Sequence, residues 1–153
     1  MIILRKVKIY LDNCCFNRPY DNQKQERIHL ESLAKLYVQQ QIIDEKISFV
    51  WSFILEYENS QNPYEIRREA IRKFSYRSRE YIDEANKEGI IKEAKDIMST
   101  GIKVKDSLHL ACAILSSCDY FITTDNRLLK YETDKIKLAD PLQFVREMEE
   151  DDD

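Results

Sequence analysis

The sequence predicts one α/β domain in which a short, mainly parallel sheet lies between two layers of helices. Short apolar segments with the character of β-strands recur along the chain, and amphipathic helical stretches separate them. This alternation is typical of a parallel sheet that is covered by helices on both faces. The length of 153 residues fits one domain with a hydrophobic core.

Four strands are expected, over residues 7–11, 47–50, 120–123 and 136–138. Each is a short apolar run, and helical patterns lie between them. In an open sheet of this kind, ligands bind beyond the carboxyl ends of the strands. Residues that follow a strand are therefore the first candidates for a functional site.

Five longer helices are expected, over residues 25–40, 62–74, 84–99, 105–116 and 142–148. Asn62-Pro63 and Asp140-Pro141 are helix starts in which a capping residue precedes proline. Gly101 follows the third helix at a position typical of a C-cap. The apolar residues expected to share one face of the first helix are Ile28, Leu33, Leu36 and Tyr37.

The expected domain covers residues 1–148, and the acidic residues 149–153 form a frayed, solvated tail. No internal repeat or linker interrupts the chain. No apolar run approaches the ~20 residues of a membrane helix, and no secretory signal pattern opens the chain. A cytoplasmic protein is therefore expected.

The composition excludes several classes of function. The two glycines of the chain are too few for a P-loop or a dinucleotide fingerprint. The net charge of -4 argues against a strongly basic nucleic-acid binder, although an acidic site loaded with divalent cations repels phosphate less. The four cysteines lack zinc-site spacing and are expected to be reduced and buried.

Two aspartates follow predicted strands. Asp12 ends the run Lys8-Ile9-Tyr10-Leu11, and Asp125 ends Phe121-Ile122-Thr123-Thr124. Either residue alone is well explained without a function, because aspartate often bonds turn backbone and Asp125 can cap a short helix over residues 127–131. Asp119 begins the strand that Asp125 ends, so about 20 Å of extended chain place it at the opposite edge of the sheet.

Two further acids lie on predicted helices. Asp106 is in the first turn of an apolar helix, where the helix dipole favours a negative charge and where a carboxylate can also face a ligand. Glu56 and Glu58 differ by about 200° around the helix axis, so they cannot share one face. A solvated salt bridge is the structural alternative for either glutamate.

Together these segments resemble the PIN-domain nucleases, over residues 8–145 and in the same order. The segments are Lys8-Ile9-Tyr10-Leu11-Asp12-Asn13, Ser52-Phe53-Ile54-Leu55-Glu56-Tyr57-Glu58, Lys105-Asp106-Ser107-Leu108-His109-Leu110-Ala111 and Thr123-Thr124-Asp125-Asn126. The resemblance implies a PIN-like three-layer α/β/α sandwich, Mg²⁺ or Mn²⁺ dependence and endoribonuclease activity, often as the toxin of a toxin-antitoxin pair. The family spacing after a serine maps its second acid to Glu58. Asn13-Cys14-Cys15 and residues 16–21 depart from the usual family pattern.

The chemistry expected of such a site is metal-dependent hydrolysis of RNA. We expect Asp12, Asp106 and Asp125 to hold the metal directly or through water, and Glu58 to complete a cluster of four catalytic carboxylates. Asn13 and Thr124 are expected to orient these carboxylates by hydrogen bonds.

Substrate contacts are expected from a basic segment. Arg72, Lys73 and Arg77 lie among Phe74, Tyr76 and other aromatic residues, a mixture that suits single-stranded RNA. A solvated helix face with balanced charges is the alternative. His109 lies one turn after Asp106, where it either reaches the site or is a hydrogen-bonded packing residue.

Other functions remain to be compared with a nuclease. An aspartyl phosphatase requires a second aspartate where this chain has Cys14, and a phosphoreceiver domain requires an acidic pair where it has Asp12-Asn13. A catalytically silent PIN-like module that binds RNA or protein is the main alternative. Besides RNA, an antitoxin protein and a second copy of the chain are the candidate partners.

Overall fold

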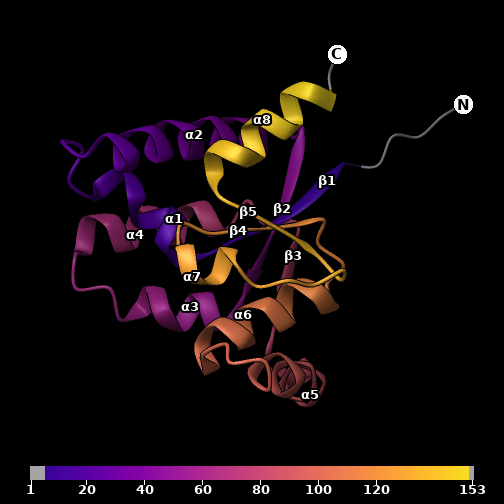
Figure 1. The fold of residues 1–153 in the computed structure, drawn as a ribbon. Helices are drawn as coiled ribbons and strands as arrows, with labels where there is room; N and C mark the ends of the chain where they lie inside the picture. Colours follow the sequence, from indigo (N-terminus) through magenta and orange to yellow (C-terminus); the bar gives the residue numbers. More distant parts are fainter. Residues whose placement is uncertain (1–5, 152–153) are drawn as a thin grey trace, which may run out of the picture.

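Five parallel strands form the centre of the molecule in the computed structural model, which describes residues 6–151 (Figure 1). The sheet order is β3-β2-β1-β4-β5. The strands are β1 (Val7–Leu11), β2 (Ile47–Ser52), β3 (Glu80–Ile82), β4 (Tyr120–Ile122) and β5 (Lys137–Ala139). The predicted α/β sandwich with a parallel sheet is confirmed. The sequence did not reveal β3, because an edge strand of three residues is too short to show alternation.

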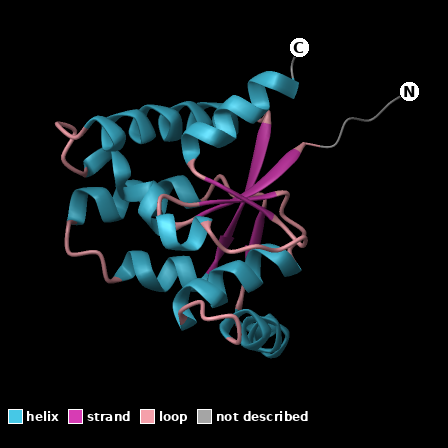
Figure 2. Cartoon of the chain, in the orientation of Figure 1, coloured by secondary structure: helices cyan, strands magenta, loops and turns pink. Residues whose placement is uncertain are grey.

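Helices cover both faces of this sheet, with α2 and α8 on one side and α5 and α6 on the other (Figures 1 and 2). The helices are α1 (Asn13–Asn17), α2 (Glu26–Ile43), α3 (Phe53–Ser60), α4 (Glu65–Ser75), α5 (Lys87–Met98), α6 (Val104–Leu115), α7 (Asn126–Leu129) and α8 (Pro141–Asp151). Two 3₁₀ turns are η1 (Arg18–Tyr20) and η2 (Glu84–Asn86). Within the described residues, no helix is both long enough and apolar enough to cross a membrane.

The predicted helix start at Asn62-Pro63 is wrong, because α4 begins at Glu65 and Asn62 instead accepts the backbone N–H of Tyr64 at 3.1 Å in the preceding turn. The start predicted at Asp140-Pro141 is confirmed. Asp140 accepts a hydrogen bond from the backbone N–H of Gln143 at 2.8 Å, at the start of α8. Gly101, after α5, has a positive φ of 103°, a conformation that glycine adopts without strain. Helix α8 continues to Asp151, so residues 149–151 are helical where a frayed tail was expected, and residues 152–153 lie outside the described part.

The predicted apolar face of α2 is wrong. Leu33, Leu36 and Tyr37 are 52%, 47% and 45% exposed, whereas the side that packs on the sheet carries Ala34, Val38 and Ile42. Two buried charged residues conceal this side in the sequence. Glu31 forms an ion pair with Arg18 at 3.0 Å, and the ammonium of Lys35 lies over the rings of Phe16 and Phe74 at 5.5 and 5.6 Å.

Aromatic side chains and cysteines fill the core. Phe16 packs against Phe49, Trp51 and Phe74, with ring centroids 6.5, 5.4 and 6.2 Å apart. All four cysteines are free, and Cys15, Cys112 and Cys118 are buried, as expected for reduced thiols that act as small apolar residues.

Strands β1 and β4 lie side by side at the switch point of the sheet, where the chain begins to add strands on the other side of β1. From β1 the chain passes to β2, and from β4 it passes outward to β5 on the other side. The backbone N–H of Asp12 donates to the carbonyl of Ile122 at 2.9 Å, so the two strand ends are joined directly. In open α/β sheets, this switch point is where ligands bind.

Candidate active site

Asp12 occupies the switch point and is held there by three neighbours. One carboxylate oxygen accepts the backbone N–H of Asn13 at 2.8 Å, and the other accepts the hydroxyl of Thr123 at 2.9 Å and the thiol of Cys14 at 3.6 Å. Its exposed fraction is 8%. Asp12 therefore caps α1, as an aspartate in a turn does. Its carboxylate is also held in one orientation at the carboxyl edge of the sheet.

Asp125 follows β4 and caps α7 by accepting the backbone N–H of Arg127 at 2.9 Å. Its own N–H donates to the hydroxyl of Thr123 at 3.1 Å, so Thr123 connects the loops that carry Asp125 and Asp12. Thr124, which was expected to orient a carboxylate, instead uses its backbone, donating to Cys14 Sγ and accepting from Arg27. Asn13 contacts Asp12 through its backbone N–H.

Asp106 lies in the first turn of α6 and is half-buried. Burial raises the pKa of its carboxyl, the negative charges of Asp12 and Asp125 raise it further, and the charges of His109 and Lys103 oppose the rise. The three aspartates are therefore close enough to interact electrostatically. Such mutual repulsion favours uptake of a cation or a proton.

Glu56 and Glu58 on α3 have different surroundings, as helix geometry predicts. Glu56 accepts a hydrogen bond from the indole N–H of Trp51 at 2.7 Å. Glu58 contacts Nε2 of the buried His109, and its side chain is 12% exposed. Glu58 is thus directed toward α6, which also carries Asp106. Glu56 is instead hydrogen-bonded to Trp51 of β2.

A buried hydrogen-bonded chain behind Glu58 is the feature that the sequence did not reveal. The hydroxyl of Tyr10 lies 2.7 Å from Ser52 Oγ and 2.6 Å from Nδ1 of His109, whose Nε2 contacts Glu58. Ser52 also caps α3 by accepting the N–H of Leu55 at 3.2 Å. His109 is therefore both a packing residue and a link from the core to Glu58. Its position one turn after Asp106 is the signal that pointed to it.

The carboxylate oxygens at the carboxyl edge of the sheet suit a hydrated cation. Within residues 6–151, no group of three or more histidine, cysteine, aspartate or glutamate side chains is arranged to hold a metal ion directly. Mg²⁺ in proteins is commonly held by one or two carboxylates and several waters, so close convergence of all the acids is not required. The oxygen donors of Asp12, Asp106 and Asp125, and the effect of Asp12 and Asp125 on the pKa of Asp106, fit that mode of binding.

The basic residues of α4 lie away from this edge. Helix α4 runs back toward the start of β3, and Arg72, Lys73 and Arg77 are in its last turns or beyond its end. Arg72 is paired with Glu69 at 3.0 Å, which raises the pKa of its guanidinium. Phe74 is 9% exposed and packs in the core, so it cannot stack on a base.

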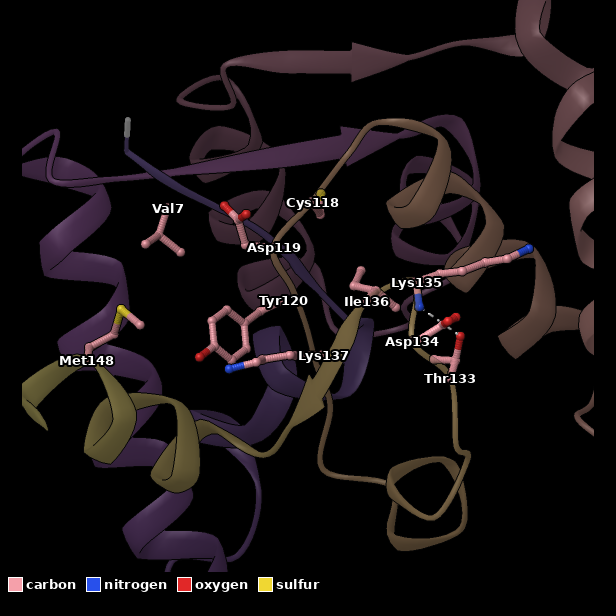
Figure 3. A pocket seen from close by; sticks show the side chains of 10 residues that line it. All are labelled: Val7, Cys118, Asp119, Tyr120, Thr133, Asp134, Lys135, Ile136, Lys137 and Met148. Carbon is pink, nitrogen blue, oxygen red and sulfur yellow. Dashed lines mark hydrogen bonds between the residues drawn. The ribbon is translucent and has the colours of Figure 1, made fainter. Parts of the chain in front are cut away.

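Two pockets lie at opposite ends of the molecule. One of about 340 Å³ adjoins the acids and is lined by Asn13, Glu58 and Lys105, among others. A larger one of about 640 Å³ surrounds Asp119 and Lys137 at the amino ends of the strands (Figure 3). Asp119, excluded from the site by strand length, accepts the backbone N–H of Lys8 at 2.8 Å there.

Comparison with protein-family models identifies the chain. The model of the PIN domain matches residues 9–133, which include all four candidate acids. No curated protein matches the sequence significantly. PIN domains are generally nucleases, and PIN nucleases generally use divalent metals. With most of its length matched by this model, the chain belongs to the PIN-domain family.

Proposed function

We propose that this protein is a metal-dependent endoribonuclease whose site is formed by Asp12, Glu58, Asp106 and Asp125. The observation that carries the proposal is that Asp12 and Asp125 follow the joined ends of β1 and β4 and that Thr123 is hydrogen-bonded to both. The raised pKa of Asp106 supports it, because the charges of Asp12 and Asp125 are among its causes. Negative charges that oppose the ionisation of a neighbouring carboxyl at a switch point are typical of functional sites. The chain also belongs to a family that generally comprises nucleases, and hydrolysis of a phosphodiester is a reaction in which such carboxylates have a role.

In this proposal Asp12, Asp106 and Asp125 hold Mg²⁺ or Mn²⁺, directly or through water. A bound divalent metal supplies a hydroxide nucleophile at neutral pH and stabilises charge on the phosphate. Thr123 and the backbone N–H of Asn13 fix the orientation of Asp12. His109 fixes that of Glu58. The contribution of these partners is preorganisation, because the carboxylates do not need to be gathered when substrate arrives.

The biological setting stays a prediction of the resemblance. A toxin role, an antitoxin protein that covers the site and a homodimer are all compatible with the proposed chemistry. The silent binding module is the competing function, and it differs in requiring no metal uptake and no cleavage.

A cleavage assay on a mixed RNA pool tests the proposal. Wild-type protein with Mn²⁺ is expected to cut the pool, addition of a chelator to stop cleavage, and Asp106→Asn to abolish it while circular dichroism shows an intact fold. Asp119→Ala is the matched control, since it removes an aspartate from the opposite edge, and it should cut RNA normally. Cleavage by Asp106→Asn at the wild-type rate would refute the assignment.

A further inference from the structure

Apart from Asn13 and Glu58, the residues that line the pocket of about 340 Å³ have no part in the proposed nuclease chemistry. Side chains from α1, α3 and the start of α4 surround it, together with Lys105. Two tyrosines of this lining are largely exposed, Tyr57 at 67% and Tyr64 at 59%. Large exposed rings beside polar groups in a concave site are typical of ligand binding.

Tyr64 is fixed by a stacked arginine. The guanidinium carbon of Arg67 lies 4.1 Å from the ring centroid of Tyr64 and 5.1 Å from that of Tyr20. Arg67 also donates to the carbonyl of Tyr20 at 3.3 Å. Arg67 thus supports the Tyr64 ring, and Tyr64 is still more than half exposed. A ring held in place loses little entropy when a ligand stacks on it.

Amide side chains connect the pocket to the site. Asn17 Nδ2 donates to the carbonyl of Asn13 at 3.1 Å, and Asn62 Nδ2 donates to Asn17 Oδ1 at 3.0 Å. The N–H of Asn13 in turn holds Asp12. Asn62 Oδ1 also accepts the backbone N–H of Tyr64 at 3.1 Å. An amide nitrogen donates twice and an amide oxygen accepts twice, so Asn62 can donate one further bond and the oxygens of Asn17 and Asn62 can each accept one, as the edge of a nucleobase requires. The chain of amides begins within one residue of a proposed metal-binding aspartate.

We propose that this pocket binds one unpaired base of a single-stranded RNA, stacked on Tyr64 and bonded along its edge by the asparagine amides. Its volume is near the lower end of the ~300–1,000 Å³ range of small-ligand sites, which suits a single nucleoside. A base within a duplex has no free face to stack. Lys105 and Arg67 supply positive charge for the adjoining phosphates. The placement next to the scissile bond rests on the proposed nuclease function.

The proposal gives a role to the segment over residues 16–21, which departs from the usual family pattern. Asn17 belongs to the amide chain, and Tyr20 contacts the arginine that supports Tyr64. Arg18 anchors the segment by ion pairs to Asp21 and Glu31 at 3.3 and 3.0 Å. The segment thus lines the pocket through Asn17 and supports Arg67 through Tyr20.

The other end of α4 provides an internal control. Arg72 and Tyr76 form a pair of the same residue types, with the guanidinium carbon 5.8 Å from the ring centroid and a hydrogen bond of 2.6 Å to the hydroxyl. Tyr76 is 70% exposed. This pair lies outside the pocket, so it should contribute nothing to recognition of a base.

Binding measured without cleavage tests the proposal. A fluorescent single-stranded RNA of about ten nucleotides is titrated with Asp106→Asn protein in a chelator, so that no RNA is cut. Adding Tyr64→Ala is expected to weaken affinity about five-fold or more, the effect of losing one stacked base. Tyr64→Phe keeps the ring and should restore affinity, and Tyr76→Ala should leave it unchanged. An abasic oligomer of equal length and a duplex should both bind more weakly than the RNA.

Three results would overturn the base pocket: equal affinity for the abasic oligomer, an unchanged affinity in Tyr64→Ala, or an equal loss in Tyr76→Ala. Absence of RNA binding by the parent protein would also overturn it. Because these titrations contain no divalent metal, they are independent of whether the wild type cuts RNA. Failure of the base pocket and failure of the nuclease assignment are therefore distinguishable.

Discussion

Strand β4 has an aspartate near each end, and the two residues have different surroundings. Asp119, before the strand, accepts the backbone N–H of Lys8 and lies in a pocket that also contains Lys135 and Lys137 (Figure 3). Asp125, after the strand, caps α7, and its charge helps to raise the pKa of Asp106. Asp119 accepts a hydrogen bond from the backbone of the neighbouring strand β1, whereas Asp125 adds a negative charge near another carboxylate.

This difference separates structural acids from functional ones. An acid that only stabilises the fold is expected to meet donors or cations, and Asp119 does. Asp12 meets donors and also repels Asp106, so it is a cap and a candidate ligand together. The volume of a pocket is a poor guide by comparison, since the larger one lies at the end without the repelling acids.

The largest expected effect is on catalysis at the carboxyl edge. Asp125→Asn should reduce RNA cleavage more than about a hundred-fold, because loss of a metal ligand should exceed the 10–100-fold effect of losing an outer-shell partner. Asp119→Ala should cleave within experimental error of the wild type. Initial rates at saturating Mn²⁺ measure both variants, and equal losses in the two would remove the distinction between the edges.

The two glutamates of α3 extend this comparison to residues two positions apart on one helix. Glu58→Gln should lower cleavage about 10–100-fold, because its carboxylate contacts His109 and faces α6. Glu56→Gln keeps an acceptor for Trp51 and should cleave normally. If the rate falls in Glu56→Gln and not in Glu58→Gln, the assignment of the fourth acid is reversed.

Stability should respond in the opposite way at the two edges. Asp119→Ala leaves the N–H of Lys8 without this acceptor and should lower the free energy of unfolding by about 1–3 kcal/mol. Asp106→Asn removes a charge that the folded protein disfavours, so it should unfold at the same temperature as the wild type or a higher one at neutral pH. Thermal denaturation in a chelator makes the comparison, and marked destabilisation by Asp106→Asn would show that its carboxylate supports the fold.

The smallest expected effect is on pH dependence. Asp106 must lose its proton to bind a metal, and its pKa lies above the ordinary value of 3.8. Activity should therefore fall on acidification at a higher pH than for an ordinary aspartate. Apo-protein stability should fall as the pH rises from 3.8 through the raised pKa, because the folded state holds this proton more tightly.

Lys103 provides the check on that pH dependence, since its charge lowers the pKa of Asp106. Lys103→Gln should move the acid limb of the pH–rate profile to higher pH. A shift to lower pH would contradict the electrostatic coupling at this edge.

Local patterns made much of the fold predictable. The strand over residues 7–11 is apolar and bounded, and the Asp140-Pro141 cap specifies a helix start within a few residues, so both match the structure. The order of the aspartates along the chain was informative for the same reason, because Asp12 and Asp125 follow a strand and Asp106 lies in the first turn of a helix. Strand β3 depends instead on pairing with β2 across the α3–α4 connection, which three residues cannot signal.

Contacts between distant residues were not predictable. The packed side of α2 contains Glu31 and Lys35, and their partners Arg18, Phe16 and Phe74 must be known before either charge is recognised as buried. The contact of His109 with Glu58 and Tyr10 likewise joins residues 51 and 99 positions apart. The spacing from Asp106 indicated that His109 could lie near the site. It did not indicate that His109 contacts Glu58.

The central claim is that the carboxyl edge of the sheet takes up a divalent metal on Asp12, Asp106 and Asp125. Calorimetric titration of metal-free protein with Mn²⁺ measures this directly. Saturable heat is predicted for the wild type and for Asp119→Ala, with heat strongly reduced in Asp106→Asn. Saturable uptake that is the same in Asp106→Asn, or absent from the folded wild type, would contradict the account.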